Sequence, residues 1–454
     1  MSADAYVRQH RDRHLDELKE ILRIPSVSTD PERAGDVKRA AAWVRDRLVR
    51  AGCTRVEIHE TARHPIVYGE WLGAPGRPTI LVYGHYDVQP ADPLELWSTP
   101  PFEPTVRDGR IYARGACDDK GQVLIHVNAL EAFLETKGTC PVNVKFLIEG
   151  EEEIGSGNLE PFVTGHKDLL ACDAVVVSDT ALFDKKTPSI THGLRGLSYA
   201  QIDVRGTSRD LHSGTFGGAV INPAFALAHI IAQLKDAKGK IKVPGFYDKV
   251  RKLTAAEHKA FARLPHSDAK LRKEIGAPAL FGEPGFTTLE RVWARPTLEV
   301  NGIWGGFSGE GAKTVIPAEA HAKISMRLVP NQSPREAFAK LEKYVKKIAP
   351  KSVQVTVRHL HHGDGWLAET DHIALQAASR AVKRAFGKAP VFTREGGSIP
   401  VIATFDRVLK VPAVLMGIGL HDDNLHAPNE KLDLDNFFKG NEAATYLMEE
   451  LGAV

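Results

Sequence analysis

Residues 79–87 read Thr-Ile-Leu-Val-Tyr-Gly-His-Tyr-Asp, and this stretch decides the fold. Its first five residues, Thr79 to Tyr83, form an unbroken apolar run rich in β-branched residues, which predicts a strand covered on both faces. His85 and Asp87 follow directly after the run. Polar side chains just beyond a buried strand are typical of an open α/β sheet, because such sheets bind ligands at the carboxyl ends of their strands.

Three further apolar runs have the same form: Val142 to Ile148, Ala174 to Val177 and Val411 to Met416. Helical periodicity lies between these runs, at Lys120–Thr136 and at Asp371–Phe386. Residues 5–51 also alternate apolar and charged positions at helical spacing, and Pro25 and Pro31 interrupt them. We expect two surface helices there, and an α/β domain whose mostly parallel mixed sheet is flanked by helices.

The middle of the chain has a different pattern. Residues 198–204, 320–328 and 353–357 alternate apolar and polar side chains, which predicts half-exposed antiparallel strands with helices on one face. We therefore predict a smaller inserted α+β domain at 197–367. The catalytic domain would then be discontinuous, with parts at 1–196 and 368–454.

Length and composition limit the classes of function. With 454 residues, the chain is long enough for two domains. Its 59 Lys and Arg nearly balance its 57 Asp and Glu, so we expect no general affinity for nucleic acid or for a membrane surface. No apolar stretch predicts a signal peptide or a membrane span. Four dispersed cysteines without a CxxC pair fit a reduced, cytoplasmic setting rather than a thiolate zinc site.

Candidate metal ligands follow each of the apolar runs. They are His85 with Asp87, the acidic run Glu149 to Glu153, Asp179 and His426, together with Asp118 and Asp119 before the helix near Lys120. Because strand ends meet at one edge of a sheet, we expect these side chains to converge. Histidine and carboxylate ligands without cysteine suit zinc, manganese or cobalt. Their number predicts two ions that share one bridging carboxylate.

Each candidate also has an ordinary structural explanation. His85 alone could be a hydrogen-bonded strand-end histidine, and Asp179 alone could cap a helix or a turn. The run Glu151 to Glu153 alone is more typical of a solvated surface. Either Asp118 or Asp119 could cap the helix, and spacing does not choose between them. Their joint occurrence at strand ends favours the metal site.

Motifs along nearly the whole chain resemble a known family. They are Tyr83 to Pro90, Tyr112 to Gly121, Glu149 to Ser156, Ser178-Asp179, Asp210 to Gly214, Lys313 to Pro317, Met326 to Asn331, Thr393 to Pro400 and His426 to Lys431. In this order they resemble the zinc metallopeptidases that include aminoacylase, glutamate carboxypeptidase, succinyl-diaminopimelate desuccinylase and the cytosolic, carnosine-type dipeptidases. The resemblance is nearest to the dipeptidase branch. It implies a phosphorylase/hydrolase-like, zinc-aminopeptidase-like catalytic domain with an inserted lid and dimerisation domain.

The resemblance also implies two divalent ions, zinc before manganese or cobalt, whose ligands are His85, Asp118, Glu153, Asp179 and His426. Asp118 would bridge the ions, while His85 with Asp179 would hold one and Glu153 with His426 the other. Glu152 matches the general base. Asp87 matches the carboxylate that accepts the N–H of the imidazole ligand. Glu151 departs from the pattern, because relatives often carry a neutral residue there, and His421, Asp422 and Asp423 are not ligands on this interpretation.

The resemblance further implies how a small substrate is bound. Arg327 matches a clamp for the substrate carboxylate, which an arginine binds bidentately. Thr314, Gly397 and Ser398 match residues around the same group, and Glu395 matches a further substrate contact. His212 resembles a histidine that reaches across the interface of a homodimer to stabilise the oxyanion.

We therefore expect a metal-dependent hydrolase that cleaves the amide bond of dipeptides or similar small peptides with a water held between the two ions. An alternative on the same scaffold is an N-acyl amino acid deacylase or a carboxypeptidase. A non-catalytic, metal-stabilised binding module is a third possibility. The presence of Glu152 argues against it, because a module of that kind does not need an extra acid beside the ligands.

Overall fold

The computed structural model describes residues 1–397 and 399–453 and separates into two compact units. The first unit comprises Met1–His192, Ala368–Thr393 and Thr404–Val454, and the second comprises Gly193–Leu367 and Arg394–Ala403. The second unit thus starts four residues before the predicted 197. It also takes in residues 394–403, which the sequence assigned to the second part of the catalytic domain.

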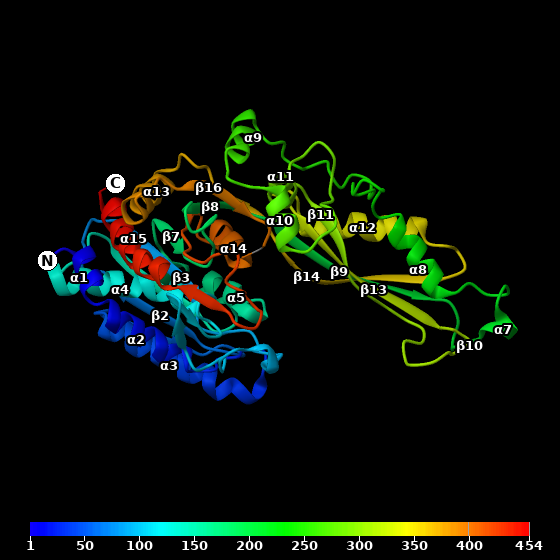
Figure 1. The fold of residues 1–454 in the computed structure, drawn as a ribbon, viewed down its shortest axis with the longest axis horizontal. Helices are drawn as coiled ribbons and strands as arrows, with labels where there is room; N and C mark the ends of the chain where they lie inside the picture. Colours follow the sequence, from blue (N-terminus) through cyan, green and yellow to red (C-terminus); the bar gives the residue numbers. More distant parts are fainter. Residues whose placement is uncertain (398, 454) are drawn as a thin grey trace. The chain divides into compact units, whose positions relative to one another are not determined.

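A large mixed sheet forms the centre of the first unit (Figure 1). Its strands, in spatial order, are β1 (Arg55–His59), β2 (Ile66–Trp71), β6 (Asn143–Glu149), β3 (Thr79–His85), β7 (Ala174–Val177), β17 (Ala413–Leu415), β8 (Ser189–Leu194) and β15 (Trp366–Leu367), and β16 (Val391–Glu395) also pairs with β8. The four central strands, β6, β3, β7 and β17, are parallel, whereas β1 pairs with β2, β2 with β6 and β8 with β17 in antiparallel fashion. The four predicted apolar runs form these central strands, and the predicted α/β class is confirmed.

Helices cover both faces of this sheet. They are α1 (Ala3–Gln9), α2 (Arg11–Leu22), α3 (Ala34–Arg50), α4 (Lys120–Lys137), α5 (Leu159–Gly165), α6 (Lys167–Leu170), α13 (Ile373–Phe386), α14 (Pro400–Val408) and α15 (Leu434–Gly452). Ile80 and Val82 of β3 belong to the core that α1 to α4, α13 and α15 complete. Tyr83 points to the opposite face, where its ring meets that of Phe405 in α14 at 5.5 Å between centroids. Burial on both faces explains why the strand sequence is uniformly apolar.

The prediction of two N-terminal surface helices is wrong in number. Three helices occupy residues 3–50, because the chain also breaks at His10, between α1 and α2. Each of the three buries an apolar side against the core, so the alternation of apolar and charged residues reflects packing on one side only.

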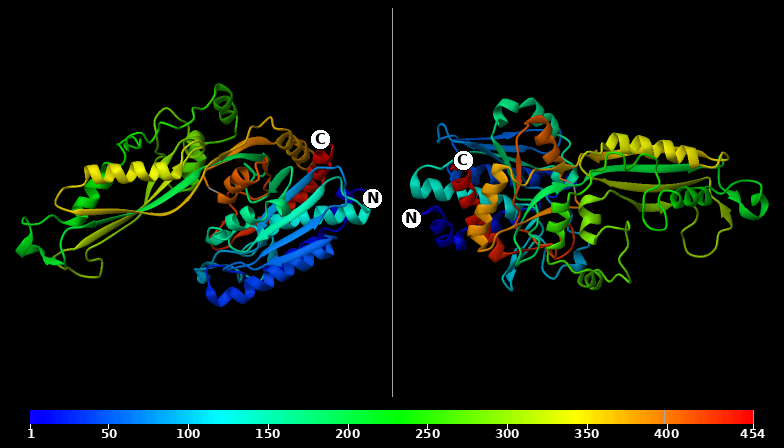
Figure 2. Two further views of the ribbon diagram at one scale, coloured as in Figure 1. Left: turned by 180° about the vertical axis from the view of Figure 1, so that it is seen from behind. Right: turned by 90° about the horizontal axis from the view of Figure 1, so that it is seen from above.

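A four-stranded antiparallel sheet forms the second unit, in the order β11 (Thr297–Trp304), β13 (Glu319–Leu328), β9 (Gly196–Arg205) and β14 (Gln354–Gly363). Alternate residues of β9 and β13 pack against α8 (Pro223–Ala232) and α12 (Pro334–Ile348) to form a separate core (Figure 2). The alternating pattern of the sequence predicted this arrangement.

Short elements complete the chain. In the second unit these are β10 (Leu211–His212), α7 (Ser213–Phe216), α9 (Ala255–Ala262), α10 (Asp268–Glu274), α11 (Thr288–Ala294) and β12 (Val315–Ile316). In the first unit, β4 (Thr105–Arg107), β5 (Arg110–Tyr112) and β18 (Lys431–Asp433) form a small sheet. Among the described residues, no helix is long and apolar enough to cross a membrane.

Candidate metal centre

The carboxyl ends of three parallel strands bring the candidate ligands of the first unit together. His85 is the last residue of β3 and lies opposite Glu149, the last residue of β6, in a parallel register. Asp179 follows β7 by two positions, and Asp118 lies two residues before α4 begins. Residues that are far apart in sequence therefore meet at one edge of the sheet, as the strand-end argument requires.

One group of potential ligands consists of His85, Asp118 and Asp179, each with one ligand atom within 4.8 Å of the others. His85 is fully buried. Its Nε2 atom lies 3.1 Å from Asp118 Oδ1 but makes no aligned hydrogen bond. A buried imidazole nitrogen that lies beside two carboxylates and makes no aligned hydrogen bond to either is the arrangement expected of a metal ligand.

A second group consists of Asp118, Glu153 and His426. His426 Nε2 lies 2.9 Å from Asp118 Oδ2 and 3.2 Å from Glu153 Oε2. Asp118 thus belongs to both groups, with one carboxylate oxygen facing His85 and the other facing His426. The donor set of two imidazoles and three carboxylates, without a thiolate, fits two divalent ions such as zinc, manganese or cobalt that share Asp118.

Asp87 holds the two halves of this site in place. Its Oδ1 atom lies 3.4 Å from His85 Nδ1, and the same imidazole nitrogen lies 3.1 Å from the backbone oxygen of Asp87. The two carboxylate oxygens also accept the backbone N–H groups of Glu152 and Glu153, at 3.2 and 3.1 Å. Asp87 therefore orients a histidine and, at the same time, anchors the short 3₁₀ turn that carries the two glutamates.

The structure separates the three consecutive glutamates by their partners. Glu151 turns away from the site, since its Oε1 atom accepts from Thr61 Oγ1 at 2.8 Å and from His64 N at 2.9 Å, and both of its oxygens accept from Asn158. Glu153 reaches His426. The departure from the family pattern at Glu151 is thus a buried loop contact, and it leaves Glu152 and Glu153 on the side of the site.

Gln89 is a residue of the site that the sequence did not single out. Its amide nitrogen donates to Glu153 Oε2 at 2.9 Å and to the backbone oxygen of Glu153 at 3.1 Å. Gln89 follows Asp87 by two positions. The signal that could have found it was the alternation His85, Asp87, Gln89 along one extended segment, in which every second side chain points the same way.

Burial and crowding of acids perturb the titration of these groups. Burial raises the pKa of Glu152 to about 8, and the nearby charge of Glu153 adds to the rise. Burial and the neighbouring Asp119 raise the pKa of Asp179 well above its usual range. Hydrogen bonds to Asp118 and Glu153 raise the pKa of His426 to about 10. So many carboxylates in one buried place call for positive charge, which divalent ions supply.

Three potential ligands that precede His426, namely His421, Asp422 and Asp423, lie outside both ligand groups. Asp423 is buried and accepts from Lys431 Nζ at 2.8 Å and from Leu420 N at 2.7 Å. Asp422 pairs with the same lysine at 3.3 Å. Neither residue, nor His421, belongs to the two groups found among the described residues.

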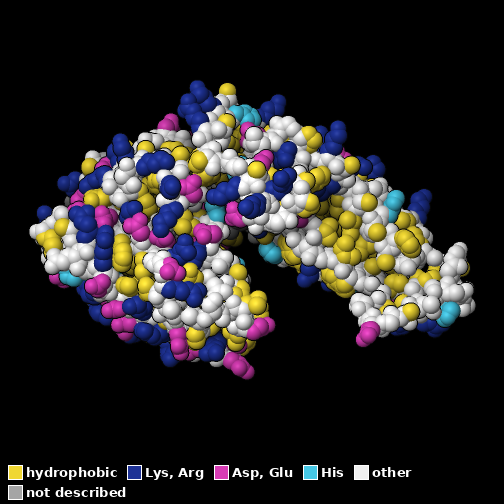
Figure 3. Space-filling view, in the orientation of Figure 1, with side chains coloured by type: hydrophobic (Ala, Val, Ile, Leu, Met, Phe, Trp, Pro, Cys, Tyr) yellow, Lys and Arg dark blue, Asp and Glu magenta, His cyan; other side chains and the backbone are white. Residues whose placement is uncertain are grey.

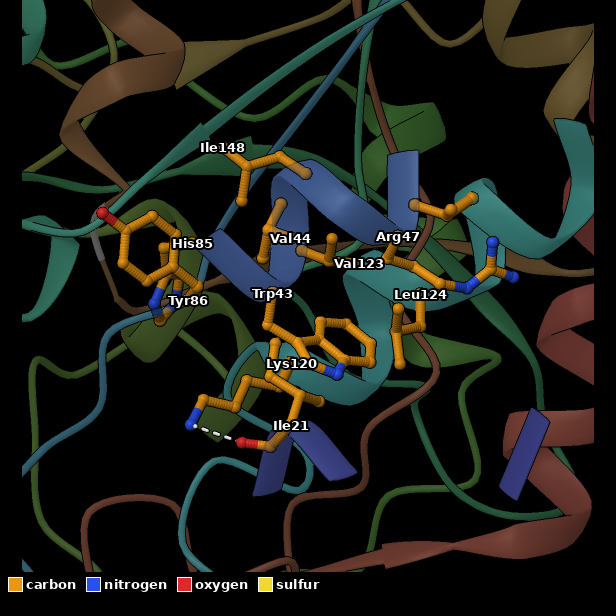
Figure 4. Close-up of a pocket in the computed structure, with 11 residues that line it drawn as sticks. Ile21, Trp43, Val44, Arg47, His85, Tyr86, Lys120, Val123, Leu124 and Ile148 are labelled. Carbon is orange, nitrogen blue, oxygen red and sulfur yellow. Dashed lines mark hydrogen bonds between the residues drawn. The ribbon is translucent and has the colours of Figure 1, made fainter. Parts of the chain in front are cut away.

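A small apolar cavity lies behind His85 (Figure 4). It is lined by His85, Tyr86 and side chains of α2, α3 and α4, among them Ile21, Val44 and Leu124. Lys120 borders it too, but its ammonium group donates to the backbone oxygens of Ile21 and Ile24. The face of His85 toward the core is therefore enclosed by apolar side chains.

The remaining predicted residues lie in the second unit or outside the described residues. His212, Thr314 and Gly397 are exposed, whereas Arg327 and Glu395 are partly buried. Ser398 lies outside the described residues. His212 Nδ1 accepts from the backbone N–H groups of Gly214 and Thr215, at 3.0 and 3.3 Å, so Nε2 carries the proton of the neutral ring.

Known proteins resemble the chain over almost its whole length. Residues 81–450 match the sequence model of peptidase family M20/M25/M40. The Cys-Gly metallodipeptidase dug1 of Schizosaccharomyces pombe is 37% identical over 465 residues, which cover 99% of this chain and 97% of that protein.

Two solved structures resemble the fold closely. Human carnosine dipeptidase 1 superposes with a TM-score of 0.86 at 33% identity, over 100% of this chain and 98% of that one. The M20 family metallo-carboxypeptidase Sso-CP2 of Sulfolobus solfataricus gives a TM-score of 0.88 at 32% identity, over 97% and 99% of the two chains.

Proposed function

Because this chain belongs to peptidase family M20/M25/M40, we propose that it is a two-metal dipeptidase in which Glu152 is the general acid and base. One observation carries the proposal. The carboxylate of Asp118 faces His85 with one oxygen and His426 with the other, at 3.1 and 2.9 Å, which is the arrangement that a pair of ions with one shared ligand requires. The names of the relatives support a dipeptide as the substrate.

We assign His85, Asp179 and Asp118 to one ion, and Asp118, Glu153 and His426 to the other. When bound, two divalent ions lower the pKa of a water molecule and polarise the substrate carbonyl. Zinc is the ion that we propose first, with manganese and cobalt as alternatives. The protein's own contribution is to keep the ligands in place, which Asp87 and Gln89 do through His85 and Glu153.

Glu152 is the proposed proton carrier. It lies beside Glu153 in a turn whose backbone Asp87 anchors, so the same residue that orients His85 holds the backbone from which the Glu152 carboxylate extends. It would take a proton from the attacking water and return it to the leaving amine. A raised pKa suits this task, since a group that titrates near neutral pH can both accept and donate.

The residues of the second unit are proposed to bind the substrate and to complete the dimer. Arg327 would hold the C-terminal carboxylate of the peptide, and Thr314, Glu395, Gly397 and Ser398 would line the same part of the substrate. His212 accepts a backbone hydrogen bond through Nδ1, so its Nε2–H takes no part in that contact. This N–H group would donate to the carbonyl oxygen of the substrate in the partner subunit's site.

Homodimer formation through the second unit is part of this proposal. Strand β11 is an edge strand and exposes Val300, Ile303 and Trp304. Phe225 of α8 is 77% exposed, and Figure 3 shows apolar side chains gathered on this unit. Exposed apolar surface and an unpaired strand edge are features of association surfaces.

A carboxypeptidase that removes one residue from longer peptides is the second candidate. The 32% identity to Sso-CP2 favours it, since that protein is named a metallo-carboxypeptidase. An N-acyl amino acid deacylase would use the same metal chemistry.

A cytoplasmic location is also proposed, supported by four cysteines that are all free.

A substrate panel tests these alternatives. The purified protein is assayed with Cys-Gly, β-Ala-His, Ala-Ala, tripeptides and N-acetyl amino acids, before chelation, after chelation and after return of zinc, manganese or cobalt. We expect dipeptide hydrolysis that is lost on chelation and restored by metal. Faster cleavage of longer peptides would favour the carboxypeptidase, and preferential deacetylation the deacylase. Metal binding without hydrolysis of any of these compounds would contradict the proposal.

A further inference from the structure

Glu430 is a fully buried carboxylate that belongs to neither ligand group. Its Oε2 atom accepts from Arg114 Nη1 at 2.8 Å and from Gly115 N at 2.9 Å. Its Oε1 atom accepts from Cys117 N at 3.0 Å and from Asp118 N at 3.1 Å. Four donors from one short segment thus satisfy the carboxylate, which leaves it acting on the backbone of Asp118.

The local fold explains why this segment needs such a side chain. Strands β5 and β18 pair in antiparallel fashion, and a hydrogen bond from Ala113 N to Glu430 O, at 3.1 Å, continues their ladder. Beyond Ala113 the chain turns toward the metal centre and no longer follows β18. Its buried N–H groups still require acceptors, and the side chain of Glu430 supplies them where the ladder ends.

The same residue also fixes the other ligand loop. His426 precedes Glu430 by four positions, in a loop that is closed by Lys431 Nζ donating to Asp423 Oδ1 at 2.8 Å and by Ala427 N donating to Asn424 O at 3.0 Å. One carboxylate therefore joins the segment that carries Asp118 to the loop that carries His426. The side chains of these two ligands approach to 2.9 Å.

We propose that Glu430 is a positioning residue that sets Asp118 against His426 and thereby determines the affinity for the ion that these two ligands share. The inference rests on the proposed function for the presence of the ion. The contacts of Glu430 with the backbone exist without it.

Glutamine is the informative replacement at this position. It keeps the size of the side chain but replaces one oxygen with an NH₂ group, which would face two N–H donors whichever way the amide is turned. The matched control is Glu442→Gln. Glu442 is also buried and also bonds to arginines, Arg8 at 2.9 Å and Arg11 at 3.2 Å, but these contacts join α1 and α2 to α15.

Hydrogen exchange in the metal-free protein is the first measurement. We expect slow exchange in the peptide that covers residues 113–119 of the unaltered protein. Exchange there should be at least about tenfold faster in Glu430→Gln and unchanged in Glu442→Gln. The unaltered protein alone can overturn the proposal, even if the variant does not fold, if its amides in this peptide exchange as fast as those of the exposed 3₁₀ turn at residues 94–96.

Metal titration is the second measurement, with zinc and with cobalt, whose absorption reports its ligands. We expect Glu430→Gln to bind the ion of the group that contains His426 about 10–100-fold more weakly, which is the usual effect of losing an outer-shell partner, and the ion of the group that contains His85 to be weakened less. If it binds both ions as tightly as Glu442→Gln does, the positioning role is wrong. If the unaltered protein binds no metal at all, the proposed function fails instead, and hydrogen exchange still decides the role of Glu430.

Discussion

The two ligand groups that share Asp118 differ in how firmly the fold holds them. His85 has a fully buried side chain at the end of a central strand, whereas the side chain of His426 is 55% exposed. His426 also lies in a loop and has a left-handed backbone conformation, with φ at 60°, which a non-glycine residue adopts only where other contacts hold it. The sheet therefore holds one candidate ligand group, and a loop completes the other. We expect the first ion to be bound more tightly than the second.

The largest expected effect comes from the residue common to both groups. Asp118→Asn removes the negative charge that both ions share and should abolish the binding of both. Turnover should then fall by more than the roughly 10⁴-fold upper range for loss of a general acid or base. Metal analysis of the dialysed variant measures this. Retention of one tightly bound ion would break the comparison, because Asp118 would then serve one group alone.

Glu152 belongs to neither group, so its replacement separates chemistry from metal binding. Glu152→Gln should lower turnover by about 10²–10⁴-fold because the proton carrier is lost. Both ions should remain, because Glu153 and not Glu152 faces His426. Elemental analysis and steady-state kinetics on the same preparation test this. A variant that loses one ion would show that Glu152 is a ligand.

Replacing each histidine in turn tests the difference between the two positions directly. His426→Ala should lower the affinity for one ion and leave the affinity for the other unchanged. The loss should be at least about tenfold, because losing a ligand costs no less than losing an outer-shell partner. His85→Ala should lower the affinity for the ion that we expect to be bound more tightly. Competition with a chelator of known affinity measures both constants. Equal effects on the same ion in the two variants would contradict the assignment of the ligands.

The smallest effect is a dependence of metal affinity on pH. In the metal-free protein the pKa of His426 is raised to about 10, so its imidazole is protonated at pH 7 and must lose that proton before it binds an ion. Affinity for the ion of the exposed group should therefore rise with pH below 10, by about tenfold per pH unit for one proton released. Calorimetry in buffers of different ionisation enthalpy counts the protons. Proton release of zero at pH 7 would contradict this prediction.

Much of the fold could be predicted from the sequence, because its strongest signals are local. Thr79 to Tyr83 is apolar throughout since both faces of β3 are covered, and residues 320–328 alternate since one face of β13 packs on helices. The break at His10 was missed because no proline or glycine marks it. The structure groups residues 394–403 with the second unit, and the sequence does not indicate this because the grouping depends on contacts distant in sequence.

The candidate site divides in the same way. The strand-end rule predicted which side chains the first unit would bring together, since it depends only on sheet topology. It could not predict the work of Gln89, Glu151 or Glu430. Each of these hydrogen-bonds to segments distant in sequence, as when Glu151 accepts from His64. Nothing near Glu151 or Glu430 in the sequence indicates such a contact, and the alternation with His85 and Asp87 is the one local sign of a role for Gln89.

The pairing of β17 with β7 has a consequence for the order in which the molecule is assembled. Ser178, just after β7, donates to the backbone oxygen of Met416, just after β17, and 238 positions separate the two residues. Because synthesis runs from the N-terminus, Asp118 and Asp179 are made long before β17, which pairs with β7, and before His426. The edge of β7 that pairs with β17 therefore stays unpaired while the whole inserted unit is synthesised, and both ligand groups can be complete only after His426 has been made.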